Sequence, residues 1–145
     1  MAVSNASLTR FLDASSTATA AELMYHVVYE TDQGEVDLCN NTAYEPLGVC
    51  VGIEDDGRLL IAGPGDRAMV ALSEDFEYSD SKIFCVDSTA KGAAKVTSPL
   101  PASTVTTLTA SWAVGYITIP GTAKGSSGLL AECVVAPMVI MTKAS

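Results

Sequence analysis

Two stretches of this sequence repeat one order of small and aliphatic residues, and this repetition constrains the fold more than any other feature. Residues 34 to 53 begin with Gly-Glu-Val-Asp-Leu and residues 92 to 119 begin with Gly-Ala-Ala-Lys-Val. After a spacer, each stretch ends in an aliphatic segment containing glycine. A further apolar run follows each stretch, at residues 59 to 63 and 129 to 135. The sequence offset between corresponding positions is not constant but increases along the chain, from about 58 to about 67 and then about 70 residues. The pattern therefore predicts a pseudo-repeat of a small β unit inside one domain, because a solenoid array would keep a fixed period.

Most of the chain has the pattern of short β-strands. Apolar residues occupy every second position at Leu47, Val49, Val51 and Ile53, which is typical of a strand with one buried face. Strands are also predicted at residues 25 to 29, 36 to 38, 58 to 62, 68 to 72, 82 to 86, 93 to 97, 111 to 119 and 129 to 145. Glycine, proline and aspartate cluster between these segments, as turns require. The sequence therefore predicts an all-β fold, a small antiparallel barrel or sandwich.

The N-terminal segment, residues 1 to 20, lacks this alternation and is rich in alanine, serine and threonine. We expect an extended arm here that carries one apolar group, formed by Leu8, Phe11 and Leu12. A capping-box match at Thr19 and Glu22 marks a place where one helical turn can begin, although strand-forming valines follow soon after. Residues 21 to 145 are expected to form the β-rich domain.

A second segment without alternation covers residues 98 to 110, whose prolines and threonines suit a long loop or an added hairpin. Trp112, the single tryptophan, opens the strand that follows this segment. Core packing and a contact between subunits are both open interpretations of Trp112. An arm and a projecting loop are two ways in which such a chain reaches a neighbouring protein.

The composition excludes several partner classes. The chain has 145 residues, enough for one domain with its own core, and its net charge of −9 comes from 17 acidic and 8 basic residues. Because the basic residues occur singly, neither nucleic acid nor an anionic membrane is an expected partner. The first twenty residues have no continuous apolar core, so we expect no signal peptide and synthesis in a cytoplasm.

The sequence contains no convincing set of catalytic residues. His26 is the single histidine and lies in a strand pattern, where a structural role is expected. Acidic residues cluster at positions 54 to 56 and 74 to 80, but without the ligand spacing of a calcium-binding loop. Four widely spaced cysteines, Cys39, Cys50, Cys85 and Cys133, are expected to be reduced and to act as small apolar residues. We therefore expect no enzyme activity, no cofactor and no metal site.

From Tyr25 onward, the order of features resembles that of head decoration proteins, or cement proteins, of tailed bacteriophages. The similarity consists of patterns of glycine and aliphatic residues. It includes His26 to Val28, Gly34, Val36, Leu38, residues 46 to 49, Gly65 to Val70, residues 82 to 87, residues 92 to 96, residues 113 to 116 and residues 132 to 135. Residues 1 to 20 and 98 to 110 lie outside it.

The resemblance implies a compact β-barrel or β-tulip domain on the outer surface of the virion capsid, commonly a homotrimer. The partner it implies is the major capsid protein. Our hypothesis is a structural protein that stabilises the assembled capsid, and we expect the N-terminal arm to bind the major capsid protein or a neighbouring copy. An alternative is a virion or surface module that binds carbohydrate or a host receptor through the threonine-rich segment 98 to 110.

Overall fold

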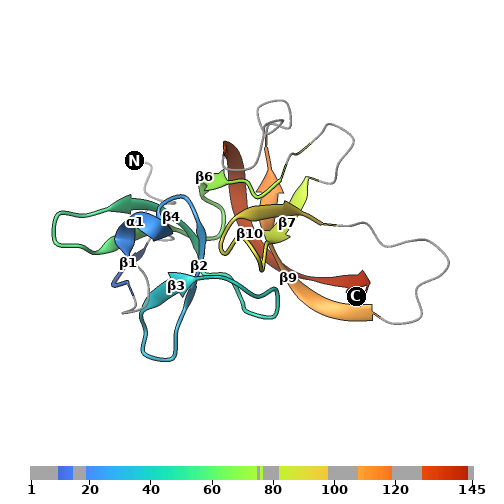
Figure 1. Cartoon of the computed structure of the whole chain (residues 1–145), viewed down its shortest axis with the longest axis horizontal. Coiled ribbons are helices and arrows are strands. Elements are labelled where there is room, and N and C mark those ends of the chain that lie inside the picture. The colour runs from blue at the N-terminus through green and yellow to red at the C-terminus, as the bar shows by residue number, and fades with distance from the viewer. Residues whose placement is uncertain are drawn as a thin grey trace.

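The structure is a computed structural model, and it describes residues 10 to 14, 19 to 74, 76, 82 to 97, 108 to 118 and 129 to 143. These residues form ten strands and one short helix (Figure 1). In chain order the elements are β1 (Arg10–Leu12), α1 (Ala20–Leu23), β2 (Val27–Glu30), β3 (Val36–Leu38), β4 (Gly48–Ile53), β5 (Leu59–Ala62), β6 (Arg67–Ala71), β7 (Ile83–Val86), β8 (Ala94–Val96), β9 (Leu108–Ile117) and β10 (Leu130–Lys143). The prediction of an all-β fold is confirmed, and β2 to β10 lie where alternation predicted strands.

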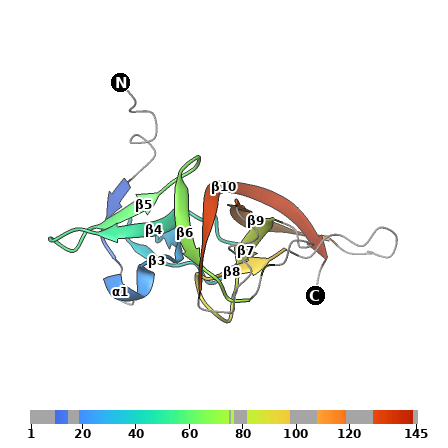
Figure 2. The same ribbon diagram turned by 90° about the horizontal axis from the view of Figure 1, so that it is seen from above.

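The strands form two five-stranded antiparallel sheets with the same topology. The first sheet has the order β1-β5-β4-β2-β3 and the second has the order β6-β10-β9-β7-β8. Adding five to each strand number of the first order gives the second order. We call β1 to β5 the first repeat and β6 to β10 the second repeat; they lie next to each other along the long axis (Figures 1 and 2). The predicted pseudo-repeat is confirmed, and each copy comprises five strands.

The equivalence extends to single positions. Gly48 of β4 and Gly115 of β9 are equivalent, because they pair with equivalent positions of β2 and β7. In the same way, the pairing of the strands makes Ala62 of β5 equivalent to Val134 of β10. The offset between Ala62 and Val134 is two residues larger than the offset of about 70 residues that the sequence pattern predicts. The sequence pattern aligns Leu59 and Leu60 with Leu129 and Leu130 because these residues are identical. The hydrogen-bonded pairing of the strands gives a different alignment, and this pairing defines the register.

A close approach of backbones occurs at the same place in both repeats. A Cβ atom at Gly48 would lie 1.9 Å from the carbonyl oxygen of Ala62, and one at Gly115 would lie 2.0 Å from the carbonyl oxygen of Val134. Glycine at these two positions therefore permits a close approach of neighbouring backbones.

Each sheet curls until its edges meet at one residue pair. An isolated parallel bridge joins Ala14 to Val36 in the first repeat, and another joins Leu72 to Ala94 at the equivalent place in the second. Among the described residues no longer ladder joins these edges. The expected barrel is therefore present as two curled, open sheets and not as a closed barrel.

Two apolar cores follow from this arrangement. The inner face of the first sheet carries Val28, Val36, Cys50, Leu59 and Ile61, which pack around Leu23 of α1. The opposite face of the same sheet, with Val27, Val49 and Ala62, belongs to one larger core with the inner face of the second sheet. The first sheet is thus covered on both faces, and its second face forms the contact between the repeats.

The described part of the N-terminal segment belongs to the first repeat. Phe11 and Leu12 lie in β1, which is extended as expected but pairs with β5 as an edge strand of the sheet. The capping box predicted at Thr19 is present: its Oγ1 accepts from Glu22 N–H at 3.3 Å, and Glu22 Oε2 accepts from Thr19 N–H at 2.9 Å. The helix α1 is a single turn, and no helix among the described residues is long and apolar enough to cross a membrane.

Candidate functional site

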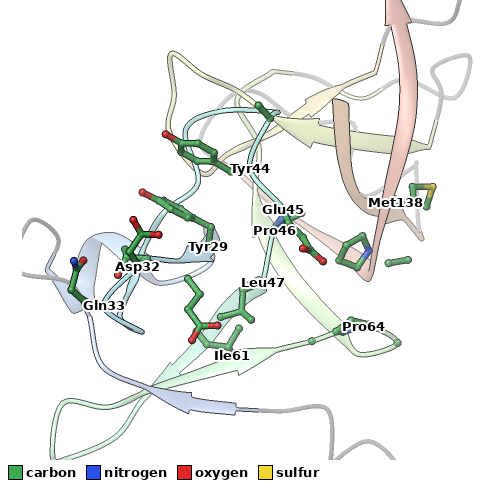
Figure 3. A pocket seen from close by; sticks show the side chains of 17 residues that line it. Tyr29, Asp32, Gln33, Tyr44, Glu45, Pro46, Leu47, Ile61, Pro64 and Met138 are labelled. Atoms are coloured by element: carbon green, nitrogen blue, oxygen red, sulfur yellow. The ribbon is translucent and has the colours of Figure 1, made fainter. Parts of the chain in front are cut away.

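A pocket of about 1370 Å³ lies where loops of the first repeat meet strand β10 of the second (Figure 3). Tyr29 and Tyr44 lie on one side of it, and Pro64 and Met138 lie on the other. We call it the tyrosine pocket. Its lining consists of Tyr29, Glu30, Thr31, Asp32, Gln33, Ala43, Tyr44, Glu45, Pro46, Leu47, Ile61, Gly63, Pro64, Gly65, Ala136, Pro137 and Met138.

The two tyrosines form the aromatic wall of the pocket. Their ring centroids are 4.8 Å apart at an interplanar angle of 33°, a favourable separation for an aromatic pair. Tyr29 projects from β2, and desolvation together with the carboxylate of Asp37 raises its pKa. Tyr44 lies on the β3–β4 loop, which is held by a turn in which Asn41 Oδ1 accepts from Ala43 N–H at 2.8 Å. Because Tyr44 is 42% exposed, its ring is accessible to a ligand.

Carboxylates surround this aromatic wall. Glu30, Asp32 and Glu45 all line the pocket and are exposed. Asp32 and Glu45 take part in no ion pair among the described residues. The described part of the chain also contains no group of three His, Cys, Asp or Glu side chains that could hold a metal ion. The chemistry of the pocket therefore suits an occupant with apolar surface and positive charge.

The opposite wall is held by a tight turn between β5 and β6. Asp66 is 7% exposed, and its Oδ2 accepts from Gly63 N–H at 3.0 Å. Gly65 N–H donates to Val135 O at 2.7 Å, and Val135 N–H donates to Asp66 O at 2.9 Å. The sequence predicts a turn between the strands at residues 58 to 62 and 68 to 72, and this geometry agrees with it. These bonds fix the wall rigidly against β10.

After Val135, strand β10 changes its register against β9 and separates from β6. The shift lies between Val135 and Met138, and Pro137 inside it has no N–H to donate to a ladder. After the shift, β10 pairs only with β9, up to Lys143 opposite Leu108. We call residues 108 to 113 together with 138 to 143 the ribbon.

One side of the ribbon is apolar and accessible. Val139 is paired with Trp112, and Met141 is paired with Ala110, so these four share one side. Val139 is 56% exposed and Met141 is 45% exposed. The other side faces the body of the protein, where Met138 lines the tyrosine pocket. The ribbon thus presents exposed apolar side chains on a two-stranded element that pairs with no third strand within the described part of the chain.

A second apolar surface lies on the outer face of the second sheet. Ile83, Tyr116 and Val134 form one row across β7, β9 and β10, and Met69 of β6 lies in the adjoining row. Tyr116 is 41% exposed and Met69 is 40% exposed. We call these four residues the Tyr116 face. Its equivalent positions in the first sheet are Val27, Val49, Ala62 and Phe11, of which the first three are buried between the repeats.

The predicted site residues that the structure describes, Phe11, Leu12 and Trp112, are not brought together. Leu8 lies outside the described residues, as do residues 98 to 107, whereas residues 108 to 110 are part of β9. Phe11 and Leu12 in β1 and the far end of the ribbon lie at opposite ends of the molecule (Figures 1 and 2). Trp112 is half-buried in the ribbon, and its N–H donates to Thr42 O at 2.7 Å.

The residues that sequence analysis set aside have local structural contacts. His26 Nδ1 lies 2.8 Å from Met24 O, which agrees with the structural role predicted for this histidine. In the first acidic cluster, Asp56 pairs with Arg58 at 2.7 Å. In the second, Glu74 Oε1 accepts from Val96 N–H at 2.9 Å. The four cysteines are free thiols, as predicted.

Comparison of the chain with protein-family models, with curated proteins and with solved structures found no match.

Proposed function

We propose that this protein is a structural virion protein that binds the outer surface of an assembled phage capsid and stabilises it. The Tyr116 face is the observation that carries the proposal. In the first repeat the equivalent face packs against the second repeat of the same chain, so the fold itself provides one example of this surface being covered by a neighbouring unit. The resemblance of the sequence to phage decoration proteins names the major capsid protein as the partner.

The chemistry of the Tyr116 face suits such a contact. Its main row, Ile83, Tyr116 and Val134, is apolar. Arg67 lies opposite Val134 at the end of this row, and its ion pair of 2.7 Å with Glu132 lies between the row and Met69. Apolar side chains beside a charged pair agree with the mixed composition of protein interfaces. Tyrosine and methionine are both enriched in interfaces, and Tyr116 keeps a hydroxyl group for a hydrogen bond to the partner.

Stabilisation then follows from mass action. A protein that binds the assembled shell and not its separated subunits lowers the free energy of the assembled state by RT ln(1 + [L]/Kd) for each site. No chemical reaction is required. The many acidic residues of the chain remain in solvent when the Tyr116 face is covered, and their negative charge keeps the outer surface of the particle soluble.

Cosedimentation with mature capsids tests the proposal, with unexpanded procapsids as the comparison. We expect saturable binding to mature capsids, and a loss of about tenfold or more in affinity for the double variant Met69→Thr/Tyr116→Thr. Ile53→Thr is the matched control, because Ile53 is 43% exposed on β4 but lies outside the Tyr116 face. Absence of binding by the unmodified protein overturns the proposal, and equal binding by the double variant removes its structural basis.

The tyrosine pocket supports a second candidate function, a binding module for carbohydrate or a host receptor. Its paired rings and carboxylates offer a stacking surface and hydrogen-bond acceptors in one concave site. Glycan-array binding that disappears in Tyr44→Ala and persists in Tyr116→Thr would favour this candidate. Binding of no glycan by the unmodified protein would contradict it.

A further inference from the structure

We infer that copies of this chain bind one another head to tail, with the ribbon of one copy in the tyrosine pocket of the next. The inference rests on the self-association that accompanies the proposed function, and it names the two surfaces that make this contact. It does not depend on the capsid, so its failure and the failure of capsid binding are separate results.

The first observation is an uneven distribution of charge along the chain. Residues 1 to 87 contain 16 of the 17 acidic residues and four of the eight basic ones. Residues 88 to 145 contain one acidic residue, Glu132, and the remaining four basic residues, all lysine. Counted by repeat, residues 1 to 62 carry ten acidic and two basic residues, whereas residues 63 to 145 carry seven acidic and six basic residues. The first repeat is therefore strongly negative and the second is nearly neutral, so contact between two first repeats is repulsive and contact between a first and a second repeat is favoured.

The ribbon belongs to residues 88 to 145, the part of the chain with a single acidic residue. It contains no acidic residue, and Lys143 ends β10. Its accessible side carries Val139 and Met141 beside Trp112. Large apolar and aromatic side chains of this kind supply most of the binding energy when an interface covers them. Covering them also protects an exposed strand edge, which otherwise aggregates.

The tyrosine pocket has the complementary chemistry. Tyr44 offers an exposed ring for apolar contact, and Asp32 and Glu45 offer carboxylates at the rim. Neither carboxylate is neutralised by an ion pair within the described residues. A volume of about 1370 Å³ exceeds the usual range of small-ligand pockets, roughly 300 to 1,000 Å³, and is large enough for side chains of a strand pair.

The internal repeat places the pocket where the first repeat lacks a ribbon. In the second repeat, β9 and β10 continue past the close approach at Gly115 to form the ribbon. In the first repeat, the chain departs from the equivalent strands at Pro46 and Pro64, and both prolines line the pocket. The pocket therefore occupies the position at which a ribbon would extend the first sheet.

A ribbon cannot reach the pocket of its own copy. Met138 at the base of the ribbon forms part of the pocket wall, and the strand runs from there to Lys143, a length of about 17 Å at 3.3 Å per residue. The accessible end thus points away from its own pocket, and the contact must join two copies. Because ribbon and pocket are different surfaces, the contact is heterologous, and it gives a closed ring when the rotation between copies closes.

Sedimentation velocity of the purified protein tests this contact with two variants. The pocket variant is Asp32→Lys/Glu45→Lys, and the ribbon variant is Val139→Thr/Met141→Thr, which places a β-branched, strand-forming residue at both positions. The matched control is Glu54→Lys/Asp55→Lys, because it makes the same charge change at exposed residues of the β4–β5 turn. We expect the unmodified protein and the control to form a closed oligomer. We expect the affinity of self-association to fall at least about tenfold in each of the two variants.

Mixing the two variants gives the decisive result. The mixture still contains one intact ribbon and one intact pocket, so we expect a 1:1 dimer that grows no further. A monomeric unmodified protein overturns the inference. An unchanged oligomer of the pocket variant also overturns it and indicates contact between two ribbons, and a mixture that stays monomeric excludes head-to-tail binding. Glycan binding that is lost in the pocket variant without change in association assigns the pocket to the second candidate function. Capsid cosedimentation of the same variants reports on the proposed function separately.

Discussion

Replacement of Gly115 by alanine provides the sharpest test of the duplicated architecture. The new Cβ atom would lie 2.0 Å from Val134 O, whereas ordinary contacts begin at 3.4 Å, so β9 and β10 must separate by about 1.4 Å at this point. Both strands are central in their sheet, and Gly115 is buried. The displacement therefore disturbs the ladder and the core together.

The expected loss in the free energy of unfolding is about 2 kcal/mol. Overpacking of a core position costs about 1 to 3 kcal/mol, and a weakened ladder hydrogen bond adds about 1 kcal/mol. Alanine also lowers the entropy of the unfolded chain, which offsets about 0.4 to 1 kcal/mol of this loss. Because a change of 1 kcal/mol shifts the midpoint by about 2 to 4 °C in a protein of this size, the melting temperature should fall by about 4 to 8 °C.

Urea unfolding followed by circular dichroism measures this effect, with Gly52→Ala as the control. A Cβ at Gly52 meets Leu60 at 3.5 Å and 3.6 Å, which is ordinary contact, so we expect a change of about 1 kcal/mol or less. The equivalence of the repeats adds a second expectation, because Gly48→Ala should destabilise the protein about as strongly as Gly115→Ala. If Gly115→Ala unfolds like Gly52→Ala, the close approach of β9 and β10 is refuted.

Two further predictions concern the cores. Burial raises the pKa of Cys39 to about 11 and that of Cys133 to about 12, so little of either thiol is ionised at pH 8. Ellman's reagent should therefore react slowly with these two thiols in the folded protein, faster with the half-buried Cys85, and with all four thiols after denaturation. Rapid reaction of all four thiols in the folded protein would contradict the burial. Leu23→Ala should lower the free energy of unfolding in urea by about 2 to 5 kcal/mol, because it leaves a cavity in the core of the first repeat. Ile53→Ala, at an exposed position, should change this free energy by less than about 1 kcal/mol. Similar values for both variants would refute the packing of α1.

The strands and the repeat were predictable because they depend on local pattern. Alternation of apolar residues locates β4 within one residue of its start, and glycine-rich turns separate it from its neighbours. The single turn α1 was visible as a capping box, but four residues are too few for periodicity to establish a helix. Strand β1 was missed because its three residues become a strand only by pairing with β5, which lies far along the chain.

The candidate site was less predictable because it depends on contacts between distant segments. Tyr29, Tyr44 and Met138 come from three separate segments, and no local pattern connects them. Pro46 and Glu45 have the composition of an ordinary loop. The uneven charge distribution was present in the sequence and would have been found by counting each half separately. The exposure of Tyr116 left no trace, because alternation looks the same whether a neighbour covers the face or not.

The duplication turns burial at equivalent positions into an argument about where a partner binds. Val49 is fully buried against the second repeat, and its equivalent, Tyr116, is 41% exposed. A sheet face that meets only water ordinarily carries polar side chains, yet Ile83 and Val134 accompany Tyr116 in the same row. Burying such a row contributes about 25 cal/mol per Å² of apolar surface. The exposed Arg67–Glu132 pair next to it contributes little, so the affinity of a partner for this face depends on its apolar side chains.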